Sequence, residues 1–196
     1  MSRIIVFEGP DRVGKKTQSA KLKEYLEVNS KKALVVEVPI DDGITYKLIY
    51  WMLGTGLVKY FPGLFQGLQF LNRFLFQTFR LNKLEHQYDY IIFDRWSLST
   101  VVYGAATGVN PAFSNMLYNM IRKPDFTVVL LGGAHKHEAE DAYEKDLDLQ
   151  EKVSSLYADW VNDHPVESAV VDCKIPVDML SLCIISVLKA SRAIPI

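Results

Sequence analysis

The fold is decided by the stretch Glu8-Gly9-Pro10-Asp11-Arg12-Val13-Gly14-Lys15-Lys16-Thr17. It follows an apolar, strand-like run at residues 4–7 and precedes a helix-like pattern over 17–28. Gly9 and Gly14-Lys15 have the spacing of a phosphate-binding P-loop, in which backbone N–H groups surround phosphate oxygens and the lysine adds a positive charge. The N-terminus of the following helix also favours anions. We therefore expect a nucleotide site between the first strand and the first helix.

The position after Lys15 departs from this motif. A P-loop normally has Ser or Thr there, because that hydroxyl binds Mg²⁺. This chain has Lys16, and the nearest hydroxyl, on Thr17, comes one position late and is a weak candidate for a metal ligand. Lys16 either covers a phosphate or points to solvent at the helix start, where its charge is mildly unfavourable against the helix dipole. The motif thus predicts nucleotide binding and leaves open how the metal is held.

Length and composition indicate one globular domain over residues 1–196. The chain is 49% hydrophobic and 23% charged with a formal net charge of −1, which argues against broad electrostatic binding to nucleic acid or to an anionic membrane. Cys173 and Cys183 are expected to be buried thiols in a reducing compartment, because two cysteines build no disulfide or metal framework. The apolar runs at 4–7 and 177–188 are too short for a signal peptide and a membrane span. These observations predict a cytoplasmic protein whose partners are small molecules.

Short apolar runs alternate with longer helical patterns along the chain. The runs predicted as buried strands, mostly rich in Val, Ile or Phe, are 4–7, 33–38, 90–93, 126–131 and 168–171. The predicted helices are 15–29, 44–54, 64–86, 98–106, 112–121, 146–163 and 177–190. This alternation predicts a three-layer α/β fold of the P-loop NTPase type, with about five parallel strands and helices on both faces. Ligands in such folds bind at the carboxyl ends of strands, where both the P-loop and Asp94-Arg95 fall.

Four charged residues at that edge are candidates for chemistry. Asp94 closes a buried strand, where P-loop enzymes keep a carboxylate that holds a metal or a water; it can instead cap the next helix. The guanidinium group of Arg95 suits phosphate oxygens, or it forms a surface salt bridge. Arg12 can reach a γ-phosphoryl group as charge develops on it. Asp11 is better placed for a substrate hydroxyl, or it pairs with Arg12.

Three further features lie outside the P-loop. Arg73 follows Asn72 in an amphipathic helix, and its charge needs either a ligand phosphate or base edge, or an Asp or Glu across a helix interface. Tyr103 and Tyr143 can contact a base, although isolated tyrosines are more often core or rim residues. The polar segment 132–146, which begins with glycine, is a candidate mobile lid or an ordinary solvated loop.

Together these motifs resemble the thymidylate kinase family, the nucleoside monophosphate kinases that make dTDP from dTMP. The resemblance runs nearly end to end and rests on seven matches in the family's order: Phe7 to Lys15, Asn72-Arg73, Asp94 to Ser99, Tyr103-Gly104-Ala105, Lys123-Pro124-Asp125, 141–144 with 149–153, and 171–174. It implies a single kinase domain that uses Mg²⁺ with ATP. It also implies a homodimer packed through helices.

On the donor side, the resemblance implies a role for each matching residue. The residues it assigns to ATP are Gly9, Pro10, Asp11, Val13, Gly14, Lys15, Lys16, Thr17, Cys173 and Lys174. Arg12 would be the catalytic arginine, because the segment 132–146 contains none and one family subtype keeps this residue in the P-loop. Lys15 and Arg95 would also act in catalysis, and Asp94 would hold a metal-bound water.

On the acceptor side, the residues implied are Asp11, Pro39, Gln69, Asn72, Arg73, Arg95, Ser99, Tyr103 and Tyr143. Asp11 would take the sugar 3′-hydroxyl, Arg95 would clamp the acceptor phosphate, and Arg73 would contact the base or the phosphate. The two tyrosines would line the deoxyribose and leave little room for a ribose 2′-hydroxyl.

The chain also departs from the family pattern at the acceptor site and in the predicted lid. Gln69 stands where relatives usually have an aromatic ring that stacks on thymine, Asp41-Asp42 stand where an arginine is common, and Ala142 stands where a charge is frequent. We therefore expect a divergent kinase that transfers phosphate from ATP to dTMP or a 5-modified dUMP. Two alternatives remain: a kinase of another acceptor, such as dGMP or a mixed set, and a nucleotide-binding pseudo-kinase without activity.

Overall fold

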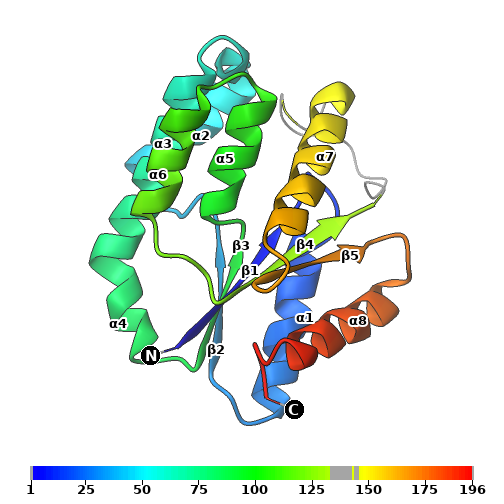
Figure 1. Cartoon of the computed structure of the whole chain (residues 1–196). Coiled ribbons are helices and arrows are strands. Elements are labelled where there is room, and N and C mark those ends of the chain that lie inside the picture. Colours follow the sequence, from blue (N-terminus) through cyan, green and yellow to red (C-terminus); the bar gives the residue numbers. More distant parts are fainter. Residues whose placement is uncertain (1, 133–142, 144–145, 196) are drawn as a thin grey trace.

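A parallel sheet of five strands organises the molecule. The computed structural model describes residues 2–132, 143 and 146–195. Its strands are β1 (Arg3–Glu8), β2 (Ala33–Glu37), β3 (Tyr90–Asp94), β4 (Phe126–Leu131) and β5 (Ser168–Asp172). They lie in the order β2-β3-β1-β4-β5, and each neighbouring pair is parallel (Figure 1). The five predicted strands are confirmed to within one residue at either end.

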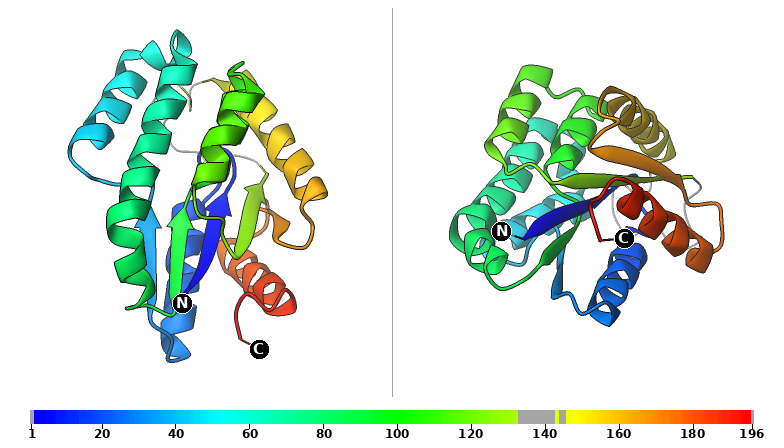
Figure 2. Two further views of the ribbon diagram at one scale, coloured as in Figure 1. Left: turned by 60° about the vertical axis from the view of Figure 1, so that its left-hand side comes forward. Right: turned by 60° about the horizontal axis from the view of Figure 1, so that its bottom comes forward.

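Helices cover both faces of this sheet, as predicted (Figures 1 and 2). They are α1 (Lys15–Val28), α2 (Ile44–Thr55), α3 (Pro62–Phe76), α4 (Asn82–Glu85), α5 (Ser97–Ala106), α6 (Pro111–Met120), α7 (Leu147–Asp163) and α8 (Val177–Ala190). The single helix expected over 64–86 is instead α3 and α4 joined by a π-helical turn at Gln77–Leu81. A short 3-10 turn at Leu57–Lys59 connects α2 to α3. Among the described helices, none is long and apolar enough to cross a membrane.

The strands are buried on both faces, which explains their continuous apolar runs. In β1, Phe7 faces the core that Leu22 of α1 and Ile184 of α8 complete. Its neighbour Val6 faces the opposite core, together with Phe76 of α3, because successive side chains of a strand point to opposite faces. The sheet is therefore a rigid middle layer that carries loops at its carboxyl edge.

The carboxyl ends of β1 and β3 meet at one edge. Phe7 stands opposite Asp94 in the parallel register, and the backbone N–H of Arg95 donates to the carbonyl oxygen of Phe7 at 2.9 Å. The order of the strands thus brings Asp94-Arg95 beside the P-loop.

The expectation of two buried cysteines is wrong for one of them. Cys173 is buried, whereas Cys183 is exposed. The buried side of α8 is the stripe formed by Leu180, Ile184 and Leu188, and position 183 falls outside this four-residue repeat.

Candidate active site

The P-loop makes a tight turn between β1 and α1. Gly9 has a φ of +138°, and a Cβ there would lie 2.3 Å from the carbonyl oxygen of Leu130, so only glycine fits. Lys15, the first residue of α1, is buried. Its Nζ donates to the carbonyl oxygens of Gly9 at 3.3 Å and Pro10 at 2.5 Å. Burial lowers the pKa of Lys15 to about 8.

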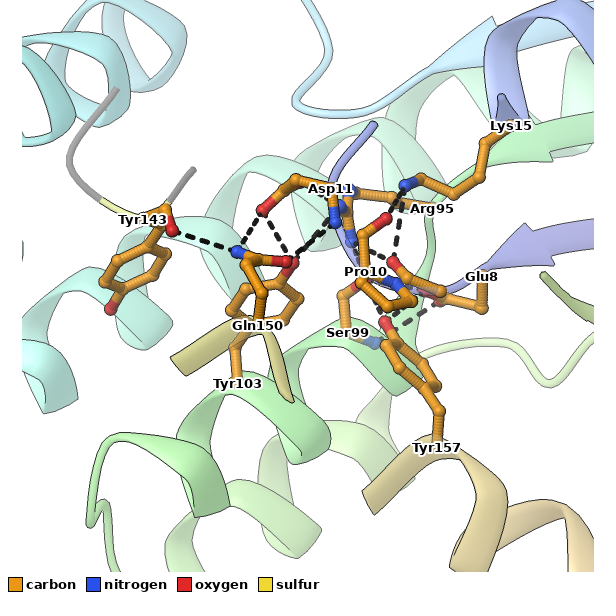
Figure 3. A network of polar contacts seen from close by, with 11 residues as sticks. Glu8, Pro10, Asp11, Lys15, Arg95, Ser99, Tyr103, Tyr143, Gln150 and Tyr157 are labelled. Atoms are coloured by element: carbon orange, nitrogen blue, oxygen red, sulfur yellow. Dashed lines mark hydrogen bonds and ion pairs between the residues drawn. The ribbon is translucent and has the colours of Figure 1, made fainter. Parts of the chain in front are cut away.

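Arg95 joins the P-loop to α5 through an ion pair with Asp11. Its Nη2 contacts the Asp11 carboxylate, and its Nη1 donates to the carbonyl oxygen of Gly9 at 3.0 Å (Figure 3). The hydroxyl of Tyr103 donates to Asp11 Oδ2 at 2.8 Å. Burial alone would raise the pKa of Asp11, but Arg95 and Lys15 hold it below its usual value. Asp11 therefore stays ionised as a hydrogen-bond acceptor.

Gln150 of α7 is a member of this cluster that the sequence analysis did not single out. Its Oε1 accepts from the backbone N–H of Asp11 at 2.8 Å, and its Nε2 donates to Asp11 Oδ2 at 2.8 Å and to the carbonyl oxygen of Tyr143 at 2.9 Å (Figure 3). The rings of Tyr103 and Tyr143 stack with their centroids 5.7 Å apart. Gln150 thus ties α7 to the P-loop and to one of the two predicted tyrosines.

Glu8, the last residue of β1, was also missed. It is fully buried and accepts hydrogen bonds from the backbone N–H of Trp96 at 2.8 Å, the Ser99 hydroxyl at 2.6 Å and the Tyr157 hydroxyl at 2.8 Å. Figure 3 shows Ser99 and Tyr157 converging on it. A signal was present in the sequence: an acidic residue that directly continues an apolar strand is rarely buried without dedicated partners.

A cavity of about 190 Å³ opens beside this cluster. Its lining residues are Asp11, Val38, Pro39, Tyr50, Leu53, Phe65, Gln66, Gln69, Arg73, Arg95, Ser99, Tyr103 and Tyr143. Every residue predicted for the acceptor lines it except Asn72. The structure therefore brings together residues from the P-loop, α3, α5 and position 143, which are far apart in the sequence.

Arg73 is almost completely buried in the wall of this cavity. Its Nη1 donates to Gln69 Oε1 at 3.2 Å and to Thr100 Oγ1 at 3.5 Å. The carboxylate proposed as one possible partner across a helix interface is not found: Arg73 forms no ion pair with any residue that the structure describes. Burial lowers the pKa of Arg73 to about 10. This arginine remains a candidate for contact with a ligand.

Comparison with known proteins identifies the family. Residues 7–181 match the family described as thymidylate kinase. The chain belongs to the thymidylate kinase family. It is therefore a nucleoside monophosphate kinase by family, an enzyme class whose reaction is phosphoryl transfer to a nucleoside monophosphate. The resemblance drawn from the seven sequence matches is confirmed.

Two solved thymidylate kinases share the fold. The enzyme from Candida albicans is 22% identical, with a TM-score of 0.79, and the match covers 97% of this chain and 92% of that one. The structure of that enzyme is described as revealing the origin of its broad substrate specificity. The enzyme from Ehrlichia chaffeensis is 23% identical, with a TM-score of 0.74 and coverage of 95% and 98%. The predicted α/β architecture is thus confirmed as that of thymidylate kinases.

Several residues of the chain are engaged in ways that the sequence did not predict. Asn72 accepts from the backbone N–H of Ile40 and donates to its carbonyl oxygen, both at 2.7 Å, so its amide holds the loop after β2. The side chain of Cys173 packs in the core between the sheet and helices α1 and α8. Its neighbour Lys174 is exposed at the same edge.

Other charged residues around the P-loop and the loop after β2 also have protein partners. Lys16 is exposed and pairs with Glu37 at 2.8 Å. Asp42 accepts from the backbone N–H of Tyr46, in the first turn of α2, at 3.0 Å. Asp11 pairs with Arg95 and both side chains are mostly buried, so this is not a surface salt bridge.

Asp94, predicted to hold a metal-bound water, is one of four carboxylates around a second cavity, together with Asp11, Glu37 and Asp41. This cavity, of about 420 Å³, is also lined by Lys15 and Arg95, and burial raises the pKa of Asp94. Thr17 is exposed on the first turn of α1. In the part of the chain that is described, no three His, Cys, Asp or Glu side chains gather to hold a metal ion. Carboxylates that line a cavity without converging on one point suit Mg²⁺ that is bound mainly by phosphate oxygens and water.

Arg12 and Gly132 line a further cavity beside the P-loop. Arg12 has a φ of +65°, which is uncommon for a residue other than glycine. The cavity, of about 200 Å³, is also lined by Gln150. Of the lid predicted at 132–146, only Gly132, Tyr143 and Asp146 are described; 133–142 and 144–145 lie outside the described residues. The prediction of a lid is therefore untested, as is the significance of Ala142.

Proposed function

We propose that the chain transfers the γ-phosphoryl group of ATP to a deoxynucleoside monophosphate, either dTMP or a 5-substituted dUMP. The observation that carries this proposal is the joining of Arg95, Asp11 and Tyr103 in one hydrogen-bonded cluster between the P-loop and the cavity of about 190 Å³. Such an arrangement supplies a cation for the acceptor phosphate and an acceptor for a sugar hydroxyl within one small space.

On the donor side, Lys15 and the backbone from Gly9 to Thr17 would hold the β- and γ-phosphates. Arg12 would stabilise the charge that develops on the transferred group. Asp94 would hold a water of the Mg²⁺ ion, and this ion, when bound with ATP, supplies positive charge to the phosphate oxygens. Lys174 would lie near the adenine. No covalent intermediate is needed, because positioning and charge neutralisation suffice for phosphoryl transfer.

On the acceptor side, Arg95 would bind the phosphate and Asp11 the 3′-hydroxyl of the sugar. The stacked rings of Tyr103 and Tyr143 would close the space that a 2′-hydroxyl needs. Gln69 would face the base in place of an aromatic ring, which favours a base with an added polar group. Pro39 lines the same cavity from the loop after β2. Ser99 and Asn72 would act indirectly, through the contacts described above.

The test is an assay of ADP release from Mg-ATP with a panel of acceptors: dTMP, dUMP, dCMP, dGMP and 5-hydroxymethyl-dUMP. We expect turnover with one or a few of these. Lys15→Met should abolish it, whereas Lys23→Met, on the same helix but outside the site, should not. Turnover with none of the acceptors, despite binding of ATP, would overturn the proposal in favour of a nucleotide-binding protein without kinase activity.

We also propose that the chain forms a homodimer through helices. Large apolar side chains are exposed on α2, α3 and α6, including Trp51, Leu64 and Met116, which are 56%, 61% and 51% exposed. Exposed apolar surface of this kind often marks a protein interface. Light scattering coupled to gel filtration should give twice the mass of the chain, and Leu64→Lys should give the monomer mass.

A further inference from the structure

One face of α3 presents a stripe of polar side chains to the acceptor cavity. Gln66, Gln69 and Arg73 all line it, and their spacing of three and seven residues places them on the same side of a helix. Apolar side chains, such as Leu53 and Phe65, line the same cavity. Polar groups in an apolar wall are the usual determinants of ligand orientation.

Gln66 stands out in this stripe because its amide nitrogen is buried without a hydrogen-bond partner among the described residues. The side chain is 2% exposed, and its Nε2 has no partner among the residues that the structure describes. The similarly buried Gln18, by contrast, donates to the carbonyl oxygen of Val177 at 3.2 Å and accepts from Ser181 at 2.8 Å. A buried donor without a partner costs about 1–3 kcal/mol, and its presence in a native fold calls for an explanation.

The neighbours of Gln66 make this part of the cavity rich in hydrogen-bond donors. Gln69 uses its Oε1 to accept from Arg73, which leaves its amide nitrogen as the end that can donate. The Nε of Arg73 also has no hydrogen-bond partner within the described chain. Among the residues that the structure describes, Asp11 alone brings a carboxylate to the lining, and Arg95, Tyr103 and Gln150 already occupy it. A ligand that completes these donors must therefore bring hydrogen-bond acceptors, such as carbonyl or hydroxyl oxygens.

We infer that Gln66 is a specificity-determining residue that donates a hydrogen bond to an oxygen of the acceptor base. This inference rests on the proposed function, in which the P-loop and α5 take the sugar and phosphate. The α3 stripe then meets the edge of the base remote from the sugar. On a pyrimidine, the oxygens of that edge are the 4-carbonyl and a hydroxyl carried on the C5 substituent. An amino group at C4, as in cytosine, is itself a hydrogen-bond donor and could not accept from the amide of Gln66.

The test compares Gln66→Met with Gln87→Met, a matched change at an exposed glutamine outside the cavity. Isothermal titration of the full chain gives dissociation constants for dUMP, dCMP, dTMP and 5-hydroxymethyl-dUMP, with ATP as a ligand for the other site. Wild type and Gln87→Met should bind dUMP more tightly than dCMP, or 5-hydroxymethyl-dUMP more tightly than dTMP. Gln66→Met should reduce that ratio of dissociation constants by about tenfold, the value of one hydrogen bond. A change in the ratio for dUMP and dCMP indicates a hydrogen bond to the 4-carbonyl. A change in the ratio for 5-hydroxymethyl-dUMP and dTMP indicates a hydrogen bond to the C5 hydroxyl.

Two outcomes would overturn the inference. One is an unchanged pair of ratios in Gln66→Met. The other is an equal loss of affinity for every acceptor and for ATP, which indicates a structural role. If Gln66→Met does not fold, Gln66→Glu serves in the same titrations and should reverse the preference toward dCMP. Failure of the proposed function is distinct, because then the wild-type chain itself would bind none of these acceptors.

Discussion

Removal of the Glu8 carboxylate should weaken the fold and the acceptor site together. Glu8 accepts from the backbone N–H groups of Trp96 at 2.8 Å and Ser99 at 3.3 Å, and from the hydroxyls of Ser99 and Tyr157. The two hydroxyls lie 3.1 Å apart and can rotate toward each other, but the two N–H groups cannot turn away. At about 1–3 kcal/mol for each orphaned donor, Glu8→Ala should lower the free energy of unfolding by roughly 2–6 kcal/mol.

Glu8→Gln removes the negative charge of the side chain and keeps its shape. Its Oε1 can still accept from both N–H groups, and its Nε2 can donate to the hydroxyls of Ser99 and Tyr157. Only the charge is lost, and hydrogen bonds to charged groups are about twice as strong as neutral ones, so a loss of about 1–2 kcal/mol is expected. This variant should fold and should bind the acceptor phosphate more weakly, because Glu8 anchors the segment that carries Arg95.

Urea unfolding followed by circular dichroism gives the two free energies, and titration with the acceptor gives the affinity. Glu167→Gln, at an exposed position, is the control for loss of one negative charge. The reasoning is refuted if Glu8→Ala unfolds within about 0.5 kcal/mol of wild type, the range of ordinary surface changes. It is also refuted if Glu8→Gln weakens ATP and acceptor binding equally.

Three further predictions concern the ATP side and the acceptor side of the site. Arg12→Ala should lower turnover sharply while ATP still binds, and unchanged turnover would remove Arg12 from the mechanism. Gln69→Phe should tighten dTMP relative to 5-hydroxymethyl-dUMP; an unchanged ratio of their dissociation constants would mean that Gln69 does not face the base. Lys15, with a pKa of about 8, is cationic below that pH and neutral above it, so the affinity for ATP should fall as pH rises from 8, by up to about tenfold per pH unit. Lys15→Met should abolish this dependence, and a flat profile in the wild type would contradict it.

The architecture could be predicted because its signals are local. Each buried strand of a parallel sheet is a short apolar run, and the spacing of Gly9 and Gly14-Lys15 is characteristic of one strand-to-helix turn. Asp94-Arg95 follows the third such run, so its position at the carboxyl edge needed only the rule that parallel strands end together. The π-helical turn at Gln77–Leu81 has no comparable signal, because the residues around it continue the helical pattern.

The contacts that complete the site could not be predicted, because they depend on packing between distant elements. Gln150 reaches Asp11 only when α7 lies against the P-loop, 139 residues away in the sequence. Gln66 and Gln69 look alike in the sequence, and only the folded cavity shows that one amide is buried without a partner. The sequence indicates only the charge that Lys16 and Asp42 would bring to a phosphate. The structure shows their protein partners, which are Glu37 for Lys16 and the backbone N–H of Tyr46 for Asp42.

The central claim is that this chain moves a phosphoryl group between two nucleotides, and single-turnover transfer of label tests it most directly. Excess protein is mixed with ATP labelled at the γ-phosphate, Mg²⁺ and dTMP or 5-hydroxymethyl-dUMP, and the products are separated by chromatography. The account predicts that the label appears in the deoxynucleoside diphosphate. Label that stays in ATP, or that appears only as inorganic phosphate, would contradict it.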